Sequence, residues 1–82
     1  MTIKVLTSPS CHVCKSLKDY LKMNNIPFEE IDVTENVVER DAMEVMTLPQ
    51  VKVEGRETII SFNKSKIDEL IKDYEDLNKG SN

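Results

Sequence analysis

The chain has 82 residues and a net charge of −4, with 39% hydrophobic and 32% charged residues. This length allows one small domain with a single core, and the composition is that of a folded globular protein rather than a disordered one. The longest apolar runs are too short to span a bilayer. The negative charge argues against nucleic acid as the main partner, because phosphate binding needs a concentrated basic face.

The start of the chain lacks the apolar segment of a signal peptide, so we expect a cytoplasmic protein. In that compartment thiols are kept reduced, and two cysteines are more often catalytic, redox-sensing or metal-binding than structural. The charge is unevenly distributed, since residues 1–22 hold four lysines against one aspartate. The cysteines therefore lie in the basic part of an acidic chain.

The first part of the sequence predicts a strand, a helix and a second strand. Residues 3–6 form an apolar run typical of a buried strand, and Ser-Pro-Ser at 8–10 ends it. Apolar residues recur at helical spacing from 13 to 21, with lysines on the opposite side. Residues 28–33 alternate apolar and acidic side chains, as in a strand with one covered face. Two strands joined through a helix in about thirty residues are expected to be parallel.

The rest of the sequence predicts a helix, a hairpin and a final helix. The apolar face of the second helix is expected to be Val37, Val38, Ala42, Val45 and Met46. Pro49 ends this helix, and Gly55 supplies the turn between antiparallel strands at 50–53 and 58–60. Asn63 is expected to cap the last helix. The apolar face of that helix is expected to be Ile67, Leu70, Ile71, Tyr74 and Leu77.

The predicted order, β-α-β-α-β-β-α, is that of a thioredoxin-like α/β fold, a four-stranded mixed sheet with helices on both faces. We expect one domain over residues 1–78 and a frayed C-terminal tail over residues 79–82. The four methionines are expected to fill the core. In this fold a Cys-x-x-Cys motif directly follows the first strand.

Cys11 and Cys14 have this spacing at the predicted junction of strand and helix. The unpaired N–H groups and the dipole at a helix N-terminus stabilise a thiolate, which lowers the pKa of a cysteine there. We expect Cys11 to be the nucleophile that attacks a substrate disulfide. Cys14, one turn along, would resolve the mixed disulfide and leave a redox-active Cys11–Cys14 disulfide.

The neighbours of the pair allow two interpretations each. His12 either becomes protonated beside the thiolate and makes the pair more oxidising, or is an exposed helix residue without a role. Lys15 and Lys18 either attract an acidic partner and support the thiolate, or form the solvated face of the helix. Zinc needs four ligands, so two cysteines and one histidine predict no metal site within one chain. A metal or cluster shared between two chains is the alternative.

Several stretches together resemble the glutaredoxin family, and within it the NrdH-redoxins. The stretches are TSPSCHVC at 7–14, Ile26-Pro27-Phe28 leading into Ile31-Asp32-Val33, Thr47-Leu48-Pro49, and the hairpin glycine Gly55. A Cys-x-x-Cys motif alone is a weak signal, but its combination with Thr-Leu-Pro at this separation is specific. The likeness covers residues 2–74.

The resemblance implies a cis Leu48–Pro49 peptide bond in a loop that lies against the cysteines; the alternative is a trans proline that starts a strand. It implies that His12, Val13 and Lys15 tune the reduction potential. The substrate-binding residues that it implies are Pro9, Ser10, Thr47, Leu48, Pro49, Ser61, Phe62 and Asn63.

Two departures bear on the electron donor. Glutathione-binding glutaredoxins usually have a lysine and a tyrosine where this chain has Ser8 and Val13, and their glycine pair and acidic residue are absent from residues 60–64. NrdH-redoxins usually have Ser-Gly-Phe where this chain has Ser61-Phe62 without the glycine. That family takes electrons from thioredoxin reductase and passes them to ribonucleotide reductase.

We therefore predict a monomeric thiol-disulfide oxidoreductase that reduces protein disulfides and serves as an electron carrier in cell redox homeostasis. It would bind no cofactor, would receive electrons from NADPH through thioredoxin reductase or from glutathione, and would have ribonucleotide reductase as a candidate target. The alternative is a redox-switched binding module without turnover. Spx-type regulators share the Thr-Ser-Pro-Ser-Cys-x-x-Cys start, but they are longer and carry an inserted helical region.

Overall fold

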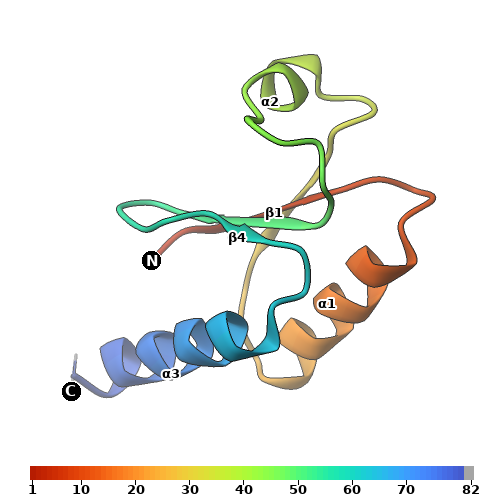
Figure 1. Ribbon diagram of the computed structural model, residues 1–82. Helices are drawn as coiled ribbons and strands as arrows, with labels where there is room; N and C mark the ends of the chain where they lie inside the picture. Colours follow the sequence, from red (N-terminus) through yellow and green to blue (C-terminus); the bar gives the residue numbers. More distant parts are fainter. Residues whose placement is uncertain (81–82) are drawn as a thin grey trace.

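Four strands form one mixed sheet in the order β2-β1-β3-β4 (Figure 1), in a computed structural model that describes residues 1–80. The strands are β1 (Ile3–Thr7), β2 (Glu29–Asp32), β3 (Gln50–Val53) and β4 (Ile59–Ile60). β1 is parallel to β2 and antiparallel to β3, and β3 is antiparallel to β4. The turn between β3 and β4 contains Gly55 at φ 79°, a conformation that glycine adopts without a Cβ clash. The predicted topology is confirmed.

The helices cover the two faces of the sheet unequally. α1 (His12–Met23) and α3 (Lys64–Gly80) lie on one side of the sheet, and α2 (Val37–Asp41) lies on the other (Figure 1). The core between the sheet and the α1/α3 layer contains Ile3, Val5, Leu17, Leu21, Ile26, Val51, Val53, Ile59, Ile67, Leu70 and Ile71. The buried cluster on the α2 side is Leu6, Ile31, Val33 and Met43, with Leu48 packed against it.

The predicted second helix is wrong in length and in its buried face. α2 ends at Asp41, and the side chains of Val37, Val38, Val45 and Met46 are exposed. Pro49 excludes helix only at residue 49 and the residue before it, so it does not account for the end of α2 at Asp41. The Val45 carbonyl accepts a hydrogen bond from the side chain of Gln50, which ties this segment to the start of β3. The β-branched start of the segment also lowers its helix propensity.

Other local predictions are partly confirmed. Met43 is buried, but Met1, Met23 and Met46 are exposed, so most of the methionines do not fill the core. Leu77, expected on the apolar face of α3, is also exposed. α3 extends to Gly80, and residues 81–82 of the predicted tail lie outside the described residues. The domain boundary at residue 78 stays a prediction. Over residues 1–80, no helix combines the length and the hydropathy that a membrane crossing requires.

Candidate active site

The two cysteines form a disulfide at the N-terminus of α1. Their Cα atoms are 5.3 Å apart; Cys11 is half-buried, whereas Cys14 is 1% exposed. Cys11 is the N-cap of the helix, and its Sγ accepts a hydrogen bond of 3.1 Å from the backbone N–H of Cys14. The N–H of Cys11 donates to the Ser8 carbonyl at 3.2 Å, which closes the turn that follows β1. The expected position of the pair at the start of the helix is confirmed.

The register of the sheet brings three loops to the end where the disulfide lies. Leu6 pairs with Gln50, and Gln50 pairs with Ile60. The chain therefore leaves β1 toward the cysteines, enters β3 from residues 47–49, and leaves β4 toward residues 61–63, all at one end of the sheet. The residues that were expected to bind substrate come from these three loops, although their binding role stays a prediction.

The proline loop has the conformation that the resemblance implies. The Leu48–Pro49 peptide bond is cis, and the Pro49 side chain is buried. The N–H of Ser61 donates to the Pro49 carbonyl at 2.7 Å, which ties the loop before β3 to the residues after β4. Ser61 lies at φ 63°, the left-handed region that favours glycine.

The predicted site residues differ in exposure. Those whose side chains are exposed are Pro9, Ser10, His12, Val13, Lys15, Thr47 and Asn63, whereas Leu48, Ser61 and Phe62 are half-buried. Lys15 forms an ion pair with Asp19 at 3.6 Å, one turn along α1, which favours the solvated-face interpretation for this lysine. Asn63 caps α3, since its Oδ1 accepts from the N–H of Lys66 at 3.3 Å.

Phe62 belongs to a cluster that joins α1 to α3. Its ring lies 5.5 Å from that of Tyr20, between centroids, and packs against the larger core. The Tyr20 hydroxyl donates to Asp68, which also pairs with Lys64 at 3.0 Å. The Tyr20 hydrogen bond, with that of Lys64, holds the pKa of the Asp68 carboxyl below its ordinary value. The start of α3 is thereby fixed against the helix that carries the cysteines.

A polar group beneath α1 was not found from the sequence. The Glu30 carboxylate in β2 accepts hydrogen bonds from the Lys18 ammonium at 2.6 Å and from the buried Thr7 hydroxyl at 3.0 Å. The Lys18 hydrogen bond, with help from Thr7, lowers the pKa of Glu30 although burial opposes the shift. The solvated-face interpretation of Lys18 is therefore wrong, because its side chain is 22% exposed and points to Glu30. The sequence did contain a signal for this contact: acidic residues alternate with apolar ones in β2, and the helix before it carries several lysines.

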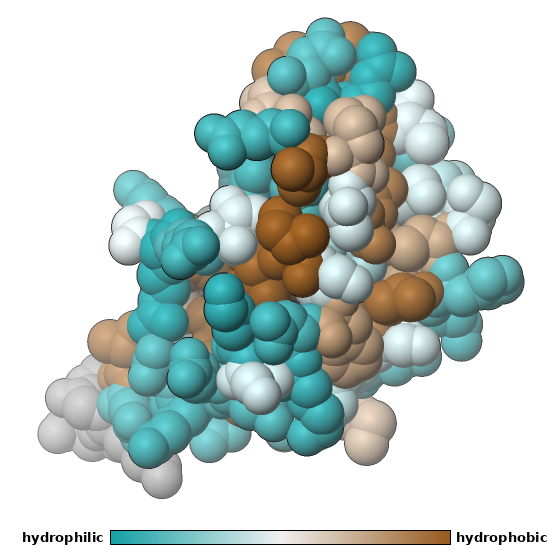
Figure 2. Space-filling model, viewed as in Figure 1, coloured by the Kyte–Doolittle hydropathy of each residue, from teal (hydrophilic) through white to brown (hydrophobic). Residues whose placement is uncertain are grey.

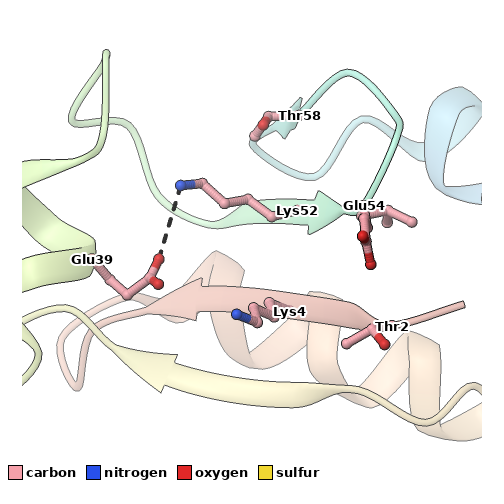
Figure 3. Close-up of a pocket in the computed structure, with 7 residues that line it drawn as sticks. Thr2, Lys4, Glu39, Lys52, Glu54 and Thr58 are labelled. Atoms are coloured by element: carbon pink, nitrogen blue, oxygen red, sulfur yellow. Dashed lines mark ion pairs between the residues drawn. The ribbon is translucent and has the colours of Figure 1, made fainter.

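A depression of about 500 Å³ lies on the α2 side of the sheet, away from the disulfide (Figure 3). Lys4 and Lys52 are opposite each other in register on β1 and β3, and Figure 3 shows both side chains extending along the sheet toward the α2 end. Glu39 of α2 pairs with Lys52 at 3.9 Å. No cysteine lines this depression. Among the described residues there is also no group of three or more histidine, cysteine or acidic side chains placed to hold a metal.

A thioredoxin-like sheet with a Cys-x-x-Cys disulfide at the start of its first helix defines a thiol-disulfide redox protein. The sequence model of the glutaredoxin family matches residues 3–58. The chain therefore belongs to the glutaredoxin family, and Cys11 and Cys14 are its redox-active pair.

Three known proteins illustrate the relationship. The glutaredoxin-like 8.6 kDa protein of the rubredoxin operon of Clostridium pasteurianum is 37% identical over 73 residues, 84% of this chain and 96% of that protein. The structure of the thioredoxin-like protein BC3987 matches with a TM-score of 0.76 and 32% identity over 84% of this chain and 99% of that one. NrdH-redoxin from Escherichia coli matches with a TM-score of 0.71 and 26% identity, over 85% and 95% of the two chains.

Proposed function

We propose that the protein reduces disulfide bonds in other proteins as a two-electron dithiol carrier. The observation that carries the proposal is the contrast between the cysteines: Cys11 is half-buried and accepts the Cys14 N–H, whereas Cys14 is enclosed. A backbone N–H directed at a sulfur stabilises its thiolate form. In the reduced protein this contrast makes Cys11 the nucleophile and Cys14 the resolving thiol.

The reaction has two exchange steps. The Cys11 thiolate attacks one sulfur of the substrate disulfide, which forms a mixed disulfide and releases the other sulfur as a thiolate. Cys14 then loses its proton and attacks the Cys11 sulfur, so that the second substrate thiol leaves and the Cys11–Cys14 disulfide forms. The substrate gains two electrons, and the pair must recover two electrons from a reductant.

We propose thioredoxin reductase, supplied by NADPH, as this reductant. Ser8 and Val13 stand where glutathione-binding glutaredoxins usually have a lysine and a tyrosine, so two contacts for the tripeptide are missing. The match to E. coli NrdH-redoxin, a glutaredoxin-like protein with a thioredoxin-like activity profile, supports the same donor. Glutathione is the alternative.

The proposed docking surface for the substrate protein is apolar. Figure 2 shows an apolar strip that runs down the middle of one face, from the loop after α2 across β4. Val45 and Ile60 line a depression of about 350 Å³ there, and Met46 and Val13 are exposed. We expect this surface to bind an apolar chain segment next to the disulfide of the substrate protein. We also propose that the carrier is monomeric and cytoplasmic. By its likeness to NrdH-redoxins, ribonucleotide reductase is the first target to test.

The test is a coupled assay of NADPH oxidation with a protein disulfide substrate, supplied either with thioredoxin reductase or with glutathione and its reductase. We expect turnover with thioredoxin reductase, no turnover for Cys11→Ser, and a trapped mixed disulfide for Cys14→Ser in non-reducing gels. Ser16→Ala, on the exposed side of the same helix, is the matched control and should keep wild-type turnover.

Two outcomes would overturn the proposal. Turnover that survives in Cys11→Ser would refute the role of the nucleophile. A wild-type protein that turns over no disulfide, yet binds a partner differently in its two oxidation states, would instead establish the redox-switched binding module.

A further inference from the structure

Gln50 is a polar side chain in a buried position. It is 2% exposed and begins β3, directly after Pro49. In register it lies between Leu6 of β1 and Ile60 of β4, so the three side chains share the face of the sheet that α2 covers. A buried amide at this place needs partners, because an unpaired buried polar group is costly.

Both partners of the amide belong to the loop that leads into the cis-proline. The Gln50 Nε2 donates to the carbonyl oxygen of Val45 at 2.8 Å and to that of Thr47 at 3.0 Å. A primary amide has two N–H groups, and these two bonds use both of them. Gln50 makes no hydrogen bond to either cysteine among the described residues.

The loop has few other ties to the sheet. Over the described residues, no backbone–backbone hydrogen bond involves residues 44–48. Met46 and Thr47 are exposed, and Leu48 is only half-buried. The side chain of Gln50 therefore supplies the hydrogen bonds that fix the path of the backbone between α2 and Pro49.

We propose that Gln50 is a positioning residue for substrate binding: its amide holds the carbonyls of Val45 and Thr47 toward the sheet and so sets the orientation in which Leu48 meets the substrate. The proposal rests on the proposed function, since it assumes that residues 47–49 contact the substrate. It predicts an effect on substrate affinity and none on the chemistry of the cysteines, because the amide touches the loop alone.

Two substitutions of similar size separate this role from simple packing. Gln50→Met keeps the length of the side chain and removes both donors. Gln50→Glu also keeps the length, but its ionised carboxylate would face two carbonyl oxygens, whereas its protonated form can donate one hydrogen bond. Val53→Ala is the matched control, because Val53 is buried in the same strand on the opposite face of the sheet.

Steady-state kinetics with a protein disulfide should show a KM about fivefold higher for Gln50→Met, with kcat changed less than about twofold. The reduction potential of the pair, measured by equilibration with a thiol buffer, should equal that of wild type. For Gln50→Glu, the KM should be compared with that of wild type at the same pH. The ratio of the two KM values should be high at pH 8, where the carboxylate is ionised, and lower at pH 5, where more of it is protonated. Val53→Ala should lower stability and leave KM unchanged.

A readout without substrate keeps the two proposals separate. Backbone amide order parameters at residues 46–48, measured by nitrogen relaxation, should be lower in Gln50→Met than in wild type, and unchanged in Val53→Ala. If the wild type reduces no protein disulfide, the proposed function fails, and the order parameters still decide the role of Gln50 in the loop. Unchanged order parameters and KM in Gln50→Met, or equal changes in Val53→Ala, would overturn the inference. If Gln50→Met does not fold, the pH dependence of Gln50→Glu decides.

Discussion

The two faces of the sheet differ in what covers them and in what they do. The face under α1 and α3 carries the larger core, with Leu17 and Ile67 fully enclosed. The other face has one five-residue helix, a small cluster around Leu6, and a loop fixed by the Gln50 amide. The proposed docking surface lies beside this thin layer. One face therefore buries most of the core, and the loop on the opposite face has fewer packing constraints.

The two faces also differ in their ion pairs: among the described residues, each face has one pair that joins a helix to a strand. On the α1 side, Lys18 and Glu30 are 2.6 Å apart, and Thr7 donates to the same carboxylate. On the α2 side, Glu39 and Lys52 are 3.9 Å apart, with Lys4 opposite Lys52 in register. The first pair has a hydrogen-bonding geometry and the second does not.

The largest expected effect tests the contrast between the two cores directly. Leu17→Ala removes a fully enclosed side chain and should destabilise the protein by about 3–5 kcal/mol. Met43 is 9% exposed and lies under the thin layer. Met43→Ala should lower the free energy of unfolding by about 2 kcal/mol or less, because the loop can move into the space that the side chain leaves. Urea denaturation followed by circular dichroism measures both. Equal losses would remove the distinction between the faces.

Ser61→Gly should stabilise the protein by about 1 kcal/mol. Serine at φ 63° bears a Cβ clash that glycine avoids, and this gain outweighs the greater chain entropy of glycine in the unfolded state. Asn25→Gly is the matched comparison, since Asn25 has φ 58° but asparagine tolerates this region better. Unfolding midpoints should rise more for Ser61→Gly. A fall in its midpoint would show that the Ser61 side chain has a stabilising contact.

Glu30→Gln should destabilise the protein at pH 7 by about 0.5–1 kcal/mol, the size expected for a half-exposed pair with a second donor. The pKa of Glu30 is below its ordinary value of 4.5 in the folded state, so its contribution is complete above that value. It is lost as the pH falls through the folded pKa. Denaturation of both proteins between pH 7 and pH 3 should therefore converge. A difference that stays constant with pH would refute the linkage.

Glu39→Gln should have the smallest effect, a destabilisation of about 0.5 kcal/mol or less, because the ammonium and carboxylate are 3.9 Å apart. Lys4→Met in the Glu39→Gln background should restore this loss, since it removes one of two like charges that lie opposite each other. The same denaturation assay applies. A loss larger than that of Glu30→Gln would reverse the ranking of the two pairs.

The sequence was informative where structure depends on local pattern. The apolar periods predicted the order of strands and helices, and the spacing of Cys11 and Cys14 after a strand predicted the disulfide site. The end of α2 at Asp41 was not predictable from Pro49, because a proline excludes helix only next to itself. For the contact of Lys18 with Glu30, the acidic alternation of β2 indicated that an ion pair with α1 could form, but which lysine and which carboxylate meet depends on how α1 crosses β2.

At the start of α1, the backbone amide of Cys14 is sensitive to the oxidation state of the cysteine pair. The sulfur of Cys11 is both the reacting atom and the acceptor of a first-turn N–H of the helix, that of Cys14. A change in the charge or bonding of this sulfur therefore changes the environment of that amide. The nitrogen chemical shift of Cys14 should distinguish the thiolate, the mixed disulfide and the closed disulfide, so the oxidation state can be followed by magnetic resonance in the unmodified protein.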